Sequence, residues 1–225
     1  MKNVKALLAT LLACAMVFAL AACSVELGGE ETWEYSGDDK ESATQVFRNF
    51  FEGTYAASNL EVSATSGGTV QFKESIDGTS DCSEFASNGT KAYSFMNGDE
   101  YVYAVDGDDS QYYMTGKENY EMGRLFYKNY VDVLDDLPED GQATFSCVVK
   151  GSKKDGVSNA TLTLEIKNGD QGSIIVTATA RDDLVQTAVM DVTDEGQNRK
   201  SELTFTYGSA KVTLPDISTW SKVES

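Results

Sequence analysis

The side chains in this sequence that could act as acids, bases or nucleophiles are almost all carboxylates. The chain has 36 Asp and Glu residues and 4 cysteines but no histidine. Histidine is the commonest general base, nucleophile activator and metal ligand, so Ser-His-Asp and Cys-His enzymes are excluded. Paired carboxylates can hydrolyse glycosides, but at this density neighbours arise by chance, and none sits in a distinctive local motif. We therefore predict no catalytic residues, no enzyme activity and no cofactor.

The acidic run that begins at Asp106 is the segment that most suggests a calcium site. An EF-hand loop starting there would need glycine at its sixth position and glutamate at its twelfth. Gln111 and Lys117 stand at those positions. We interpret the run as an acidic turn between strands, with at most weak, opportunistic calcium binding, and we predict no metal site.

The N-terminal residues have the three parts of a secretory signal. Lys2 and Lys5 are basic, residues 6–20 are uncharged and almost entirely apolar, and two alanines follow. This order is typical of an exported protein; an ordinary cleaved signal peptide and a permanent signal anchor are the alternatives to the interpretation given next. Residues 24–41 are acidic, contain glycine and lack periodicity, as a flexible tether does.

The segment Leu20-Ala21-Ala22-Cys23 resembles the bacterial lipobox. The resemblance implies that residues 1–22 are a lipoprotein signal peptide and that the Cys23 sulfur receives a diacylglyceryl group. Residues 23–41 would then be the lipidated N-terminus and tether of the mature protein. Two or more acyl chains hold a protein stably at a membrane, so the expected location is the extracytoplasmic side of the cell membrane, through the Cys23 anchor.

The charge of the chain limits its partners. The formal net charge is −18 and becomes about −20 when Lys2 and Lys5 leave with the signal. A surface of this sign repels nucleic acid and anionic lipid headgroups. We therefore predict no nucleic-acid partner and attachment to the membrane through acyl chains alone; the sequence identifies no protein partner.

Two cysteines remain in the expected mature domain once Cys14 and Cys23 are accounted for. Cys82 and Cys147 could form a disulfide, because exported proteins meet an oxidising environment. The alternative is a pair of separate thiols that behave as small apolar residues, and the expected strand order would hold them several strands apart.

The rest of the chain reads as one domain, residues 42–220, with a tail at 221–225. Residues 42–57 have helical periodicity, with Ser42 and Gln45 at capping-box spacing. A second helical pattern covers 119–137, before Pro138. Elsewhere, short alternating segments are separated by turn pairs such as Gly67-Gly68 and Asn88-Gly89, which is typical of antiparallel hairpins. We predict an α+β fold, mainly antiparallel β, with about ten strands.

The hairpin around Asn97-Gly98 carries four aromatic residues. A two-residue loop formed by Asn97 and Gly98 would place Tyr93 and Phe95 on the opposite face from Tyr101 and Tyr103. A three-residue loop, Met96 to Gly98, would place all four on one face. We predict the three-residue loop, because burying one coherent aromatic face is favourable.

This order of elements resembles the LolA/LppX-like lipoprotein carrier family. The resemblance rests on the lipobox, the helix, the strands interrupted before Pro138, and the closing segments Phe205-Thr206-Tyr207-Gly208 and Val212-Thr213-Leu214-Pro215. It implies a curved half-barrel sheet packed around an N-terminal and a mid-chain helix, with a concave face that takes lipid without covalent chemistry. The ligand-binding residues expected on that face are Tyr93, Phe95, Tyr101, Tyr103, Leu164 and Phe205.

Two functions follow from the sequence. The first is a lipid-anchored, non-enzymatic binder of a lipid or other hydrophobic ligand. The second is a surface lipoprotein with a filled core that acts through protein contacts, as an accessory or sensor domain. A cavity in the structure would favour the first, and a solid core with an exposed apolar patch would favour the second.

Overall fold

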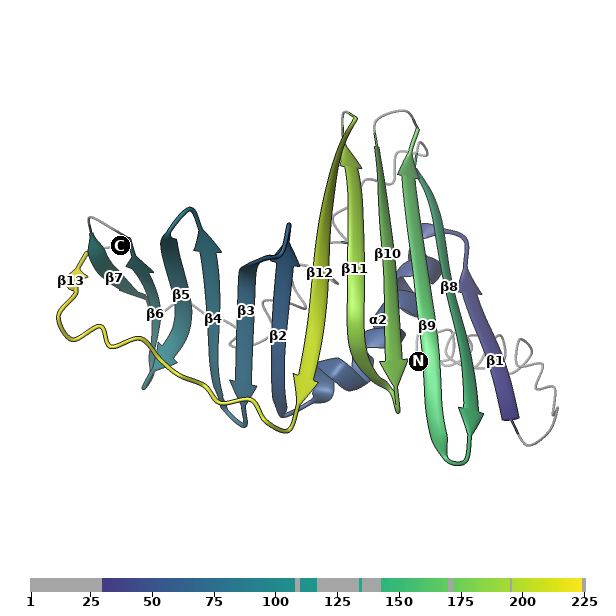
Figure 1. The fold of residues 1–225 in the computed structure, drawn as a ribbon, viewed down its shortest axis with the longest axis horizontal. Helices are drawn as coiled ribbons and strands as arrows, with labels where there is room; N and C mark the ends of the chain where they lie inside the picture. Colours follow the sequence, from purple (N-terminus) through teal and green to yellow (C-terminus); the bar gives the residue numbers. More distant parts are fainter. Residues whose placement is uncertain are drawn as a thin grey trace, which may run out of the picture.

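The structure, a computed structural model, describes residues 30–107, 110–116, 134, 143–169, 172–194 and 196–223. In this part of the chain, 13 strands form one open sheet, and one helix lies against it (Figure 1). The elements are β1 Glu30–Gly37, α2 Lys40–Ala56, β2 Asn59–Ser66, β3 Thr69–Asp77, β4 Ser80–Ser87, β5 Thr90–Asn97, β6 Glu100–Asp106, β7 Gln111–Gly116, β8 Ala143–Lys154, β9 Val157–Asn168, β10 Gly172–Arg181, β11 Leu184–Asp194, β12 Gln197–Tyr207 and β13 Ser221–Lys222.

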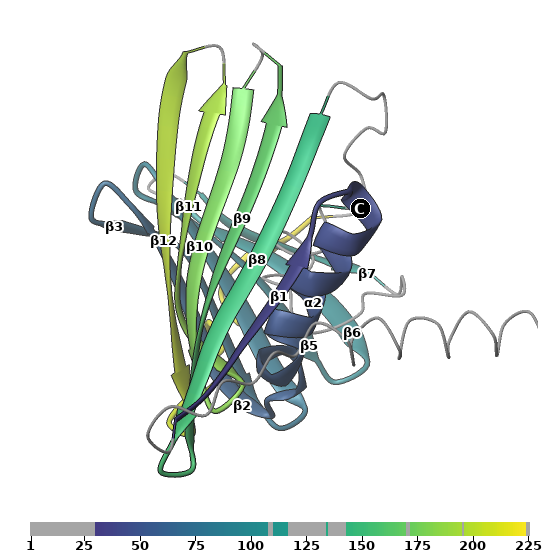
Figure 2. The ribbon, with the colours of Figure 1, turned by 90° about the vertical axis from the view of Figure 1, so that its right-hand side faces the viewer.

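The sheet order joins two antiparallel meanders through one long-range pair. The strands run β1-β8-β9-β10-β11-β12-β2-β3-β4-β5-β6-β7-β13, and β12 pairs with β2 through contacts such as Phe205 opposite Val62. All neighbours are antiparallel except β13, which lies parallel to β7. Figure 2 shows how strongly the sheet twists, since the strands of the two meanders cross in that view. The mainly antiparallel fold is confirmed, with 13 strands in place of about ten.

Several predicted hairpin turns are confirmed at the residue level. Gly67-Gly68 and Asn88-Gly89 are two-residue loops with positive φ at both positions, as a type I′ turn requires. The turn at Asp182-Asp183 has φ values of 51° and 62° and joins β10 to β11. Its sequence lacks the glycine that marks the other turns, so no local signal predicts it.

The aromatic hairpin has a different register from the predicted one. The loop between β5 and β6 is Gly98-Asp99, because Asn97 still pairs with Glu100. Gly98 has a φ of 64° and Asp99 has no positive φ, which fits a type II′ turn led by glycine. The predicted three-residue loop was therefore wrong. Gly98 takes the first position of a two-residue loop, where a type II′ turn prefers glycine.

The register of this hairpin separates the aromatic side chains. Tyr93 and Phe95 lie opposite Ala104 and Val102 on one face, and Tyr101 and Tyr103 lie on the other.

Helix α2 begins at Lys40, with Asp39 as its N-cap, and not at the predicted Ser42. The Asp39 carboxylate accepts a hydrogen bond from the Ser42 N–H at 2.8 Å, and the Asp39 N–H donates to the Ser42 hydroxyl at 3.3 Å. This reciprocal capping box lies one turn earlier than the predicted pair of Ser42 and Gln45. The hydrogen bonds also lower the pKa of Asp39. The buried residues of the helix are Ala43, Thr44, Val46, Phe47, Phe51 and Thr54.

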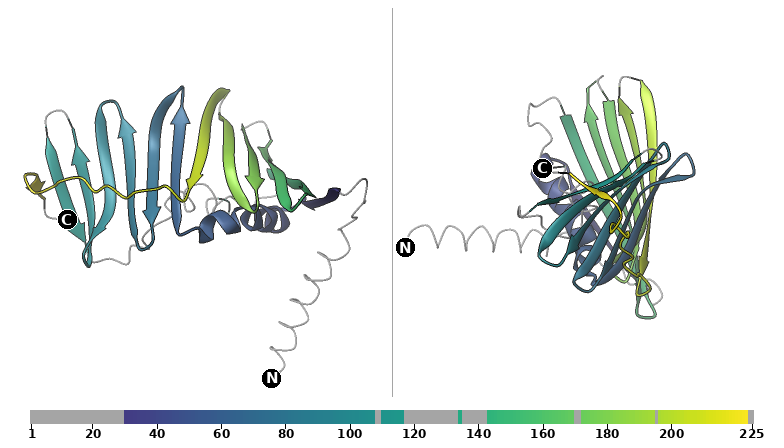
Figure 3. Two further views of the ribbon diagram at one scale, coloured as in Figure 1. Left: turned by 60° about the horizontal axis from the view of Figure 1, so that its bottom comes forward. Right: turned by 90° about the vertical axis from the view of Figure 1, so that its left-hand side faces the viewer.

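The sheet has an apolar cluster on each of its two faces. The larger cluster lies under α2 and includes Phe47, Leu164 and Phe205, all at most 4% exposed. The smaller lies on the opposite face of β4, β5 and β6, around Phe95, where Val212 and Trp220 of the C-terminal segment pack on it. Figure 3 shows this segment running across the strands toward β13.

Other boundaries predicted from the sequence need correction. Residues 30–37, taken as part of the tether, form edge strand β1, because Trp33 and Tyr35 alternate with polar residues and pair with β8. Val212 to Leu214 form no strand. Ser221 and Lys222, taken as a tail, pair with β7. The second predicted helix, 119–137, lies outside the described residues except for Leu134, which is buried in the larger cluster.

A buried polar network fixes α2 on the sheet. The Thr54 hydroxyl accepts a hydrogen bond from the Val185 N–H at 2.9 Å and lies 3.0 Å from the Tyr207 hydroxyl. The Tyr207 hydroxyl donates to the Val185 carbonyl at 2.6 Å. One helix residue is thus bound to both β11 and β12. Burial raises the pKa of Tyr207 to about 12, and the hydrogen bond to Thr54 opposes this shift.

We predict that Tyr207→Phe destabilises the protein by about 1–3 kcal/mol, because it leaves the Val185 carbonyl buried without its donor. Urea unfolding at pH 7 measures this loss. The folded state holds the phenol proton more tightly than the unfolded chain does, so the contribution of Tyr207 is fully present below about pH 10 and is lost toward about pH 12. The difference between wild type and variant should therefore narrow in that pH range. A constant difference would contradict the assignment.

Candidate functional site

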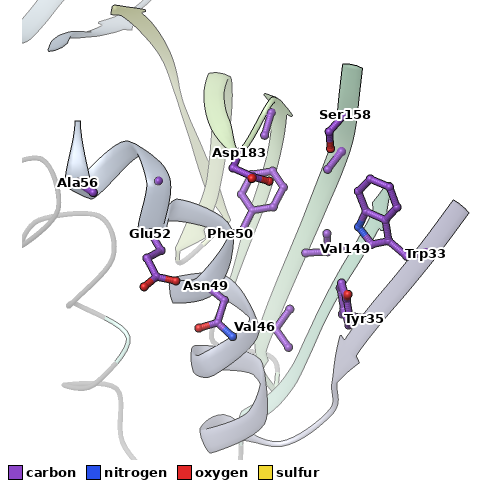
Figure 4. Close-up of a pocket in the computed structure, with 13 residues that line it drawn as sticks. Trp33, Tyr35, Val46, Asn49, Phe50, Glu52, Ala56, Val149, Ser158 and Asp183 are labelled. Atoms are coloured by element: carbon purple, nitrogen blue, oxygen red, sulfur yellow. The ribbon is translucent and has the colours of Figure 1, made fainter. Parts of the chain in front are cut away.

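A cavity of about 570 Å³ lies between α2 and the strands β1, β8, β9 and β10. Its size falls in the range of small-molecule sites. Figure 4 shows Val46 and Phe50 pointing from the helix toward the strands, with Trp33 and Tyr35 on β1 across the cavity. The lining residues are Trp33, Tyr35, Val46, Asn49, Phe50, Glu52, Gly53, Ala56, Val149, Ser158, Ala160, Ala180 and Asp183.

The cavity exists because the strands carry small residues at this end. Ser158 and Ala160 of β9 and Ala180 of β10 line it. Farther along β9 on the same face, Leu162 and Leu164 are each 1% exposed within the larger cluster. The large side chains fill the space under the middle of α2, and the small ones leave space between the helix and the strand ends.

Two glycines permit the close approach of the elements around the cavity. A Cβ atom on Gly53 of α2 would lie 2.3 Å from the Asp183 carbonyl oxygen, so the helix touches the β10–β11 turn there. A Cβ atom on Gly151 would lie 2.2 Å from Trp33 Cε2. The indole therefore lies directly over the β8 backbone, in register with its cross-strand partner. Both contacts require glycine for steric reasons.

The polar side chains of the lining come from both walls of the cavity, Asn49 and Glu52 from α2 and Ser158 and Asp183 from the strand side (Figure 4). Glu52 precedes Gly53, which contacts Asp183, and both carboxylates are exposed. Ser158 is held beside the same turn, because its N–H donates to the Asp182 carboxylate and its carbonyl accepts from the Asp182 N–H, each at 2.9 Å. Most other lining side chains are apolar. The arrangement suits non-covalent binding of a largely apolar molecule.

Two smaller hollows are less suited to such a ligand. One of about 470 Å³ lies at the turns of β3–β4 and β5–β6, where Asp77, Ser80 and Asp81 line it. Another of about 280 Å³ lies at the opposite end of β8, β9 and β10. In the described parts of the chain, no three His, Cys, Asp or Glu side chains are grouped as metal ligands would be.

The structure does not bring together the six residues predicted to bind a ligand. Leu164 and Phe205 are buried under α2, where the Phe205 ring centroid lies 6.3 Å from that of Phe51. The space that they were expected to line is filled by the helix.

The four aromatic residues of the hairpin are divided between the two faces of the sheet. Tyr93 and Phe95 belong to the smaller cluster, and the Tyr93 ring lies 6.4 Å from Trp220. Tyr101, on the other face with Tyr103, donates a hydrogen bond to the Ser94 hydroxyl at 2.9 Å. None of the six lines the cavity.

The two cysteines of the domain are separate thiols, which is the second of the two alternatives that the sequence left open. Cys82 lies on β4 and Cys147 on β8, with β9, β10, β11, β12, β2 and β3 between them. Burial raises the pKa of Cys82 to about 11, helped by Asp81 and Glu84, and that of Cys147 to about 12. Both are therefore protonated at neutral pH and lack the thiolate form, which is the nucleophilic form of cysteine.

Comparisons with known proteins identify no family. No family model matches the chain, and no curated protein matches its sequence. No helix in the described ranges has the length and apolar character needed to cross a bilayer.

The sequence carried one signal for the cavity. Trp33 and Tyr35 are spaced by two residues, as in a strand with one buried face. Their acidic neighbours Glu30, Glu31 and Glu34 made the segment look like a tether. The contributions of Ala160 and Ala180 could not be found, because a small residue marks a cavity only when the position of the opposite helix is known.

We predict that Gly53→Ala disturbs this site and lowers the free energy of unfolding by about 1–3 kcal/mol, because the new methyl group meets backbone that cannot rotate away. Gly116→Ala is the matched control, since a Cβ atom there has nothing within 4 Å. Thermal unfolding of both variants checks the prediction. Equal stability of the two would show that the helix does not lie this close to the β10–β11 turn.

Proposed function

We propose that this protein is a lipid-anchored, non-enzymatic lipoprotein that binds a hydrophobic ligand in the cavity between α2 and β1. The observation that carries the proposal is an unfilled space of about 570 Å³ with mostly apolar walls. The carrier-like class expected from the order of elements agrees with this function. The binding residues differ from those expected, because α2 fills the middle of the sheet.

The position of the cavity supports a ligand drawn from the membrane. Only residues 24–29 separate Cys23 from Glu30, the first residue of β1. At about 3.3–3.6 Å per residue, this link spans at most about 25 Å. Glu30 pairs with Lys154 beside the β8–β9 turn, and Ser158 and Asp183 line the cavity at the same end of these strands. An anchor at Cys23 therefore keeps the cavity near the bilayer surface.

A second candidate function has one observation in its favour. The interior expected to hold the ligand is solid around Leu164 and Phe205, as in a surface lipoprotein that acts through protein contacts. Binding at the cavity distinguishes the two functions, because the second requires no small ligand.

We predict that Cys23→Ser abolishes acylation and releases the protein from the membrane fraction, because its sulfur is the acceptor. Cys14→Ser is the control, since it removes a thiol from the same N-terminal segment. Labelling with an alkyne-tagged palmitate in a bacterial host, followed by fractionation, reports both effects. A labelled Cys23→Ser protein would contradict the proposed anchor.

We predict that a brominated alkyl chain bound in the cavity quenches the fluorescence of Trp33 and not that of Trp220. Trp33 lines the cavity, whereas Trp220 packs on the smaller cluster. Residues 24–225 would be prepared as Trp220→Phe and as Trp33→Phe, each with one tryptophan, and titrated with 7,8-dibromododecyl maltoside below its micelle concentration. Bromine quenches on contact, so the first variant should lose fluorescence saturably and the second should not.

A cavity-filling variant completes this test. Ala160→Leu narrows the cavity and should weaken the quenching of Trp33, whereas Ala86→Leu on β4 should leave it unchanged. Absence of saturable quenching in the Trp220→Phe protein would contradict the ligand-binding function, and equal quenching of both tryptophans would show non-specific association.

A further inference from the structure

We propose that the cavity selects a flat, rigid molecule of fused rings over a flexible chain, and that this molecule lies on a platform formed by Trp33, Ala160 and Ala180. The inference rests on the proposed function and adds the chemical class of the ligand. All three platform residues line the cavity. They come from strands β1, β9 and β10, and Gly151 of β8 lies between the first two in the sheet.

The Trp33 indole lies flat on strand β8. A Cβ atom on Gly151 would lie 2.2 Å from Cε2 of the indole, 2.3 Å from Cζ2 and 2.6 Å from Nε1. Cε2 is bonded to the other two atoms, and an atom this close to it in the plane of the ring would lie closer still to at least one of them. Because Cε2 is the nearest of the three, the Cβ position lies over the ring face. One face of the indole is therefore stacked on the Gly151 backbone.

The other face of the indole is the one that lines the cavity. Side chains two residues apart in a strand share a face of the sheet, and Tyr35 packs against the larger cluster under α2. Trp33 therefore lies on the α2 side of β1. Figure 4 shows its ring on the strand side of the cavity, with Phe50 on the helix side. The support from Gly151 holds this ring face in place before any ligand arrives.

A row of small residues continues the flat surface beyond the indole. Gly151 pairs with Trp33 on β1 and with Ala160 on β9. Ala160 pairs in turn with Ala180 on β10. Neighbouring strands lie about 4.8 Å apart, so the row extends about 10 Å from β8 to β10. No side chain from Gly151 to Ala180 in this row is larger than a methyl group, so the surface stays level.

Bulkier side chains border the platform. Val149 and Leu162 pair in the adjacent row on the same face, toward the filled core. Val46 and Phe50 of α2 line the cavity from the helix side (Figure 4). A ring system stacked on an indole gains more than its buried area alone provides. A flexible chain touches a level surface less fully and loses conformational freedom when it is confined.

Two hydrocarbons of different shape test the inference. Phenanthrene and bibenzyl have the same number of carbon atoms and similar octanol partitioning, but phenanthrene is one rigid plane and bibenzyl has two rings on a flexible link. Residues 24–225 are dialysed to equilibrium against each compound, and the bound fraction is measured by gas chromatography. Phenanthrene should bind about fivefold more tightly. The platform carries no charge, so the ratio should be the same at low and high salt.

Three variants assign the preference to the platform. Trp33→Leu removes the ring but keeps an apolar side chain, and it should bring the ratio to within about twofold. Gly151→Ala keeps the indole but displaces it from β8, so it should also lower the ratio. Trp220→Leu is the control, because it removes an indole from the smaller cluster and should keep the full ratio. Circular dichroism confirms that each variant is folded.

The outcomes separate the two proposals. Equal binding of phenanthrene and bibenzyl, or binding of the maltoside probe alone, would overturn the ring preference and leave the proposed function standing. A preference that survives in folded Trp33→Leu would overturn the assignment to the platform. Absence of saturable binding for both hydrocarbons and for the maltoside probe would contradict the proposed function itself.

Discussion

The attachment of α2 to the sheet determines both what the core contains and what it leaves open. Thr54 binds β11 and β12 through Val185 and Tyr207. The preceding residue, Gly53, lets the helix lie against the β10–β11 turn. These contacts place Phe47 and Phe51 over the large residues of β9 and β12. The same placement leaves the helix facing small residues at one end, and the cavity follows from that mismatch in side-chain size.

The two faces of the sheet explain why one chain can contain a solid core and an open site. The C-terminal segment covers the smaller cluster around Phe95, and α2 covers the larger one. The cavity of about 570 Å³ lies where α2 does not fit the strands closely. Because β1 is an edge strand joined to β8, the cavity lies at the margin of the sheet, close to where the chain leads toward Cys23.

Much of the fold could be predicted from local signals, and most of the site could not. Turn pairs such as Asn88-Gly89 and the alternation in β9 and β10 are local, and the structure confirms them. The β5–β6 register depended on whether Gly98 was the last residue of the loop, as predicted, or the first, as observed; the pair Asn97-Gly98 does not specify this. The six predicted ligand-binding residues were chosen for apolar character, but Leu164 and Phe205 use that character to pack against the helix. The actual walls combine Trp33, hidden among acidic residues, with alanines whose role depends on a distant helix.

The most direct measurement of the central claim is native mass spectrometry of residues 24–225, purified from a lipid-containing host and then denatured to release bound molecules. We predict one amphiphilic species per protein chain, lost or reduced when Ala160→Leu narrows the cavity. Protein that stays bare after incubation with a mixed lipid extract, while folded by circular dichroism, would contradict the account. In that case the space beside α2 would be a packing defect, and the function would lie in protein contacts.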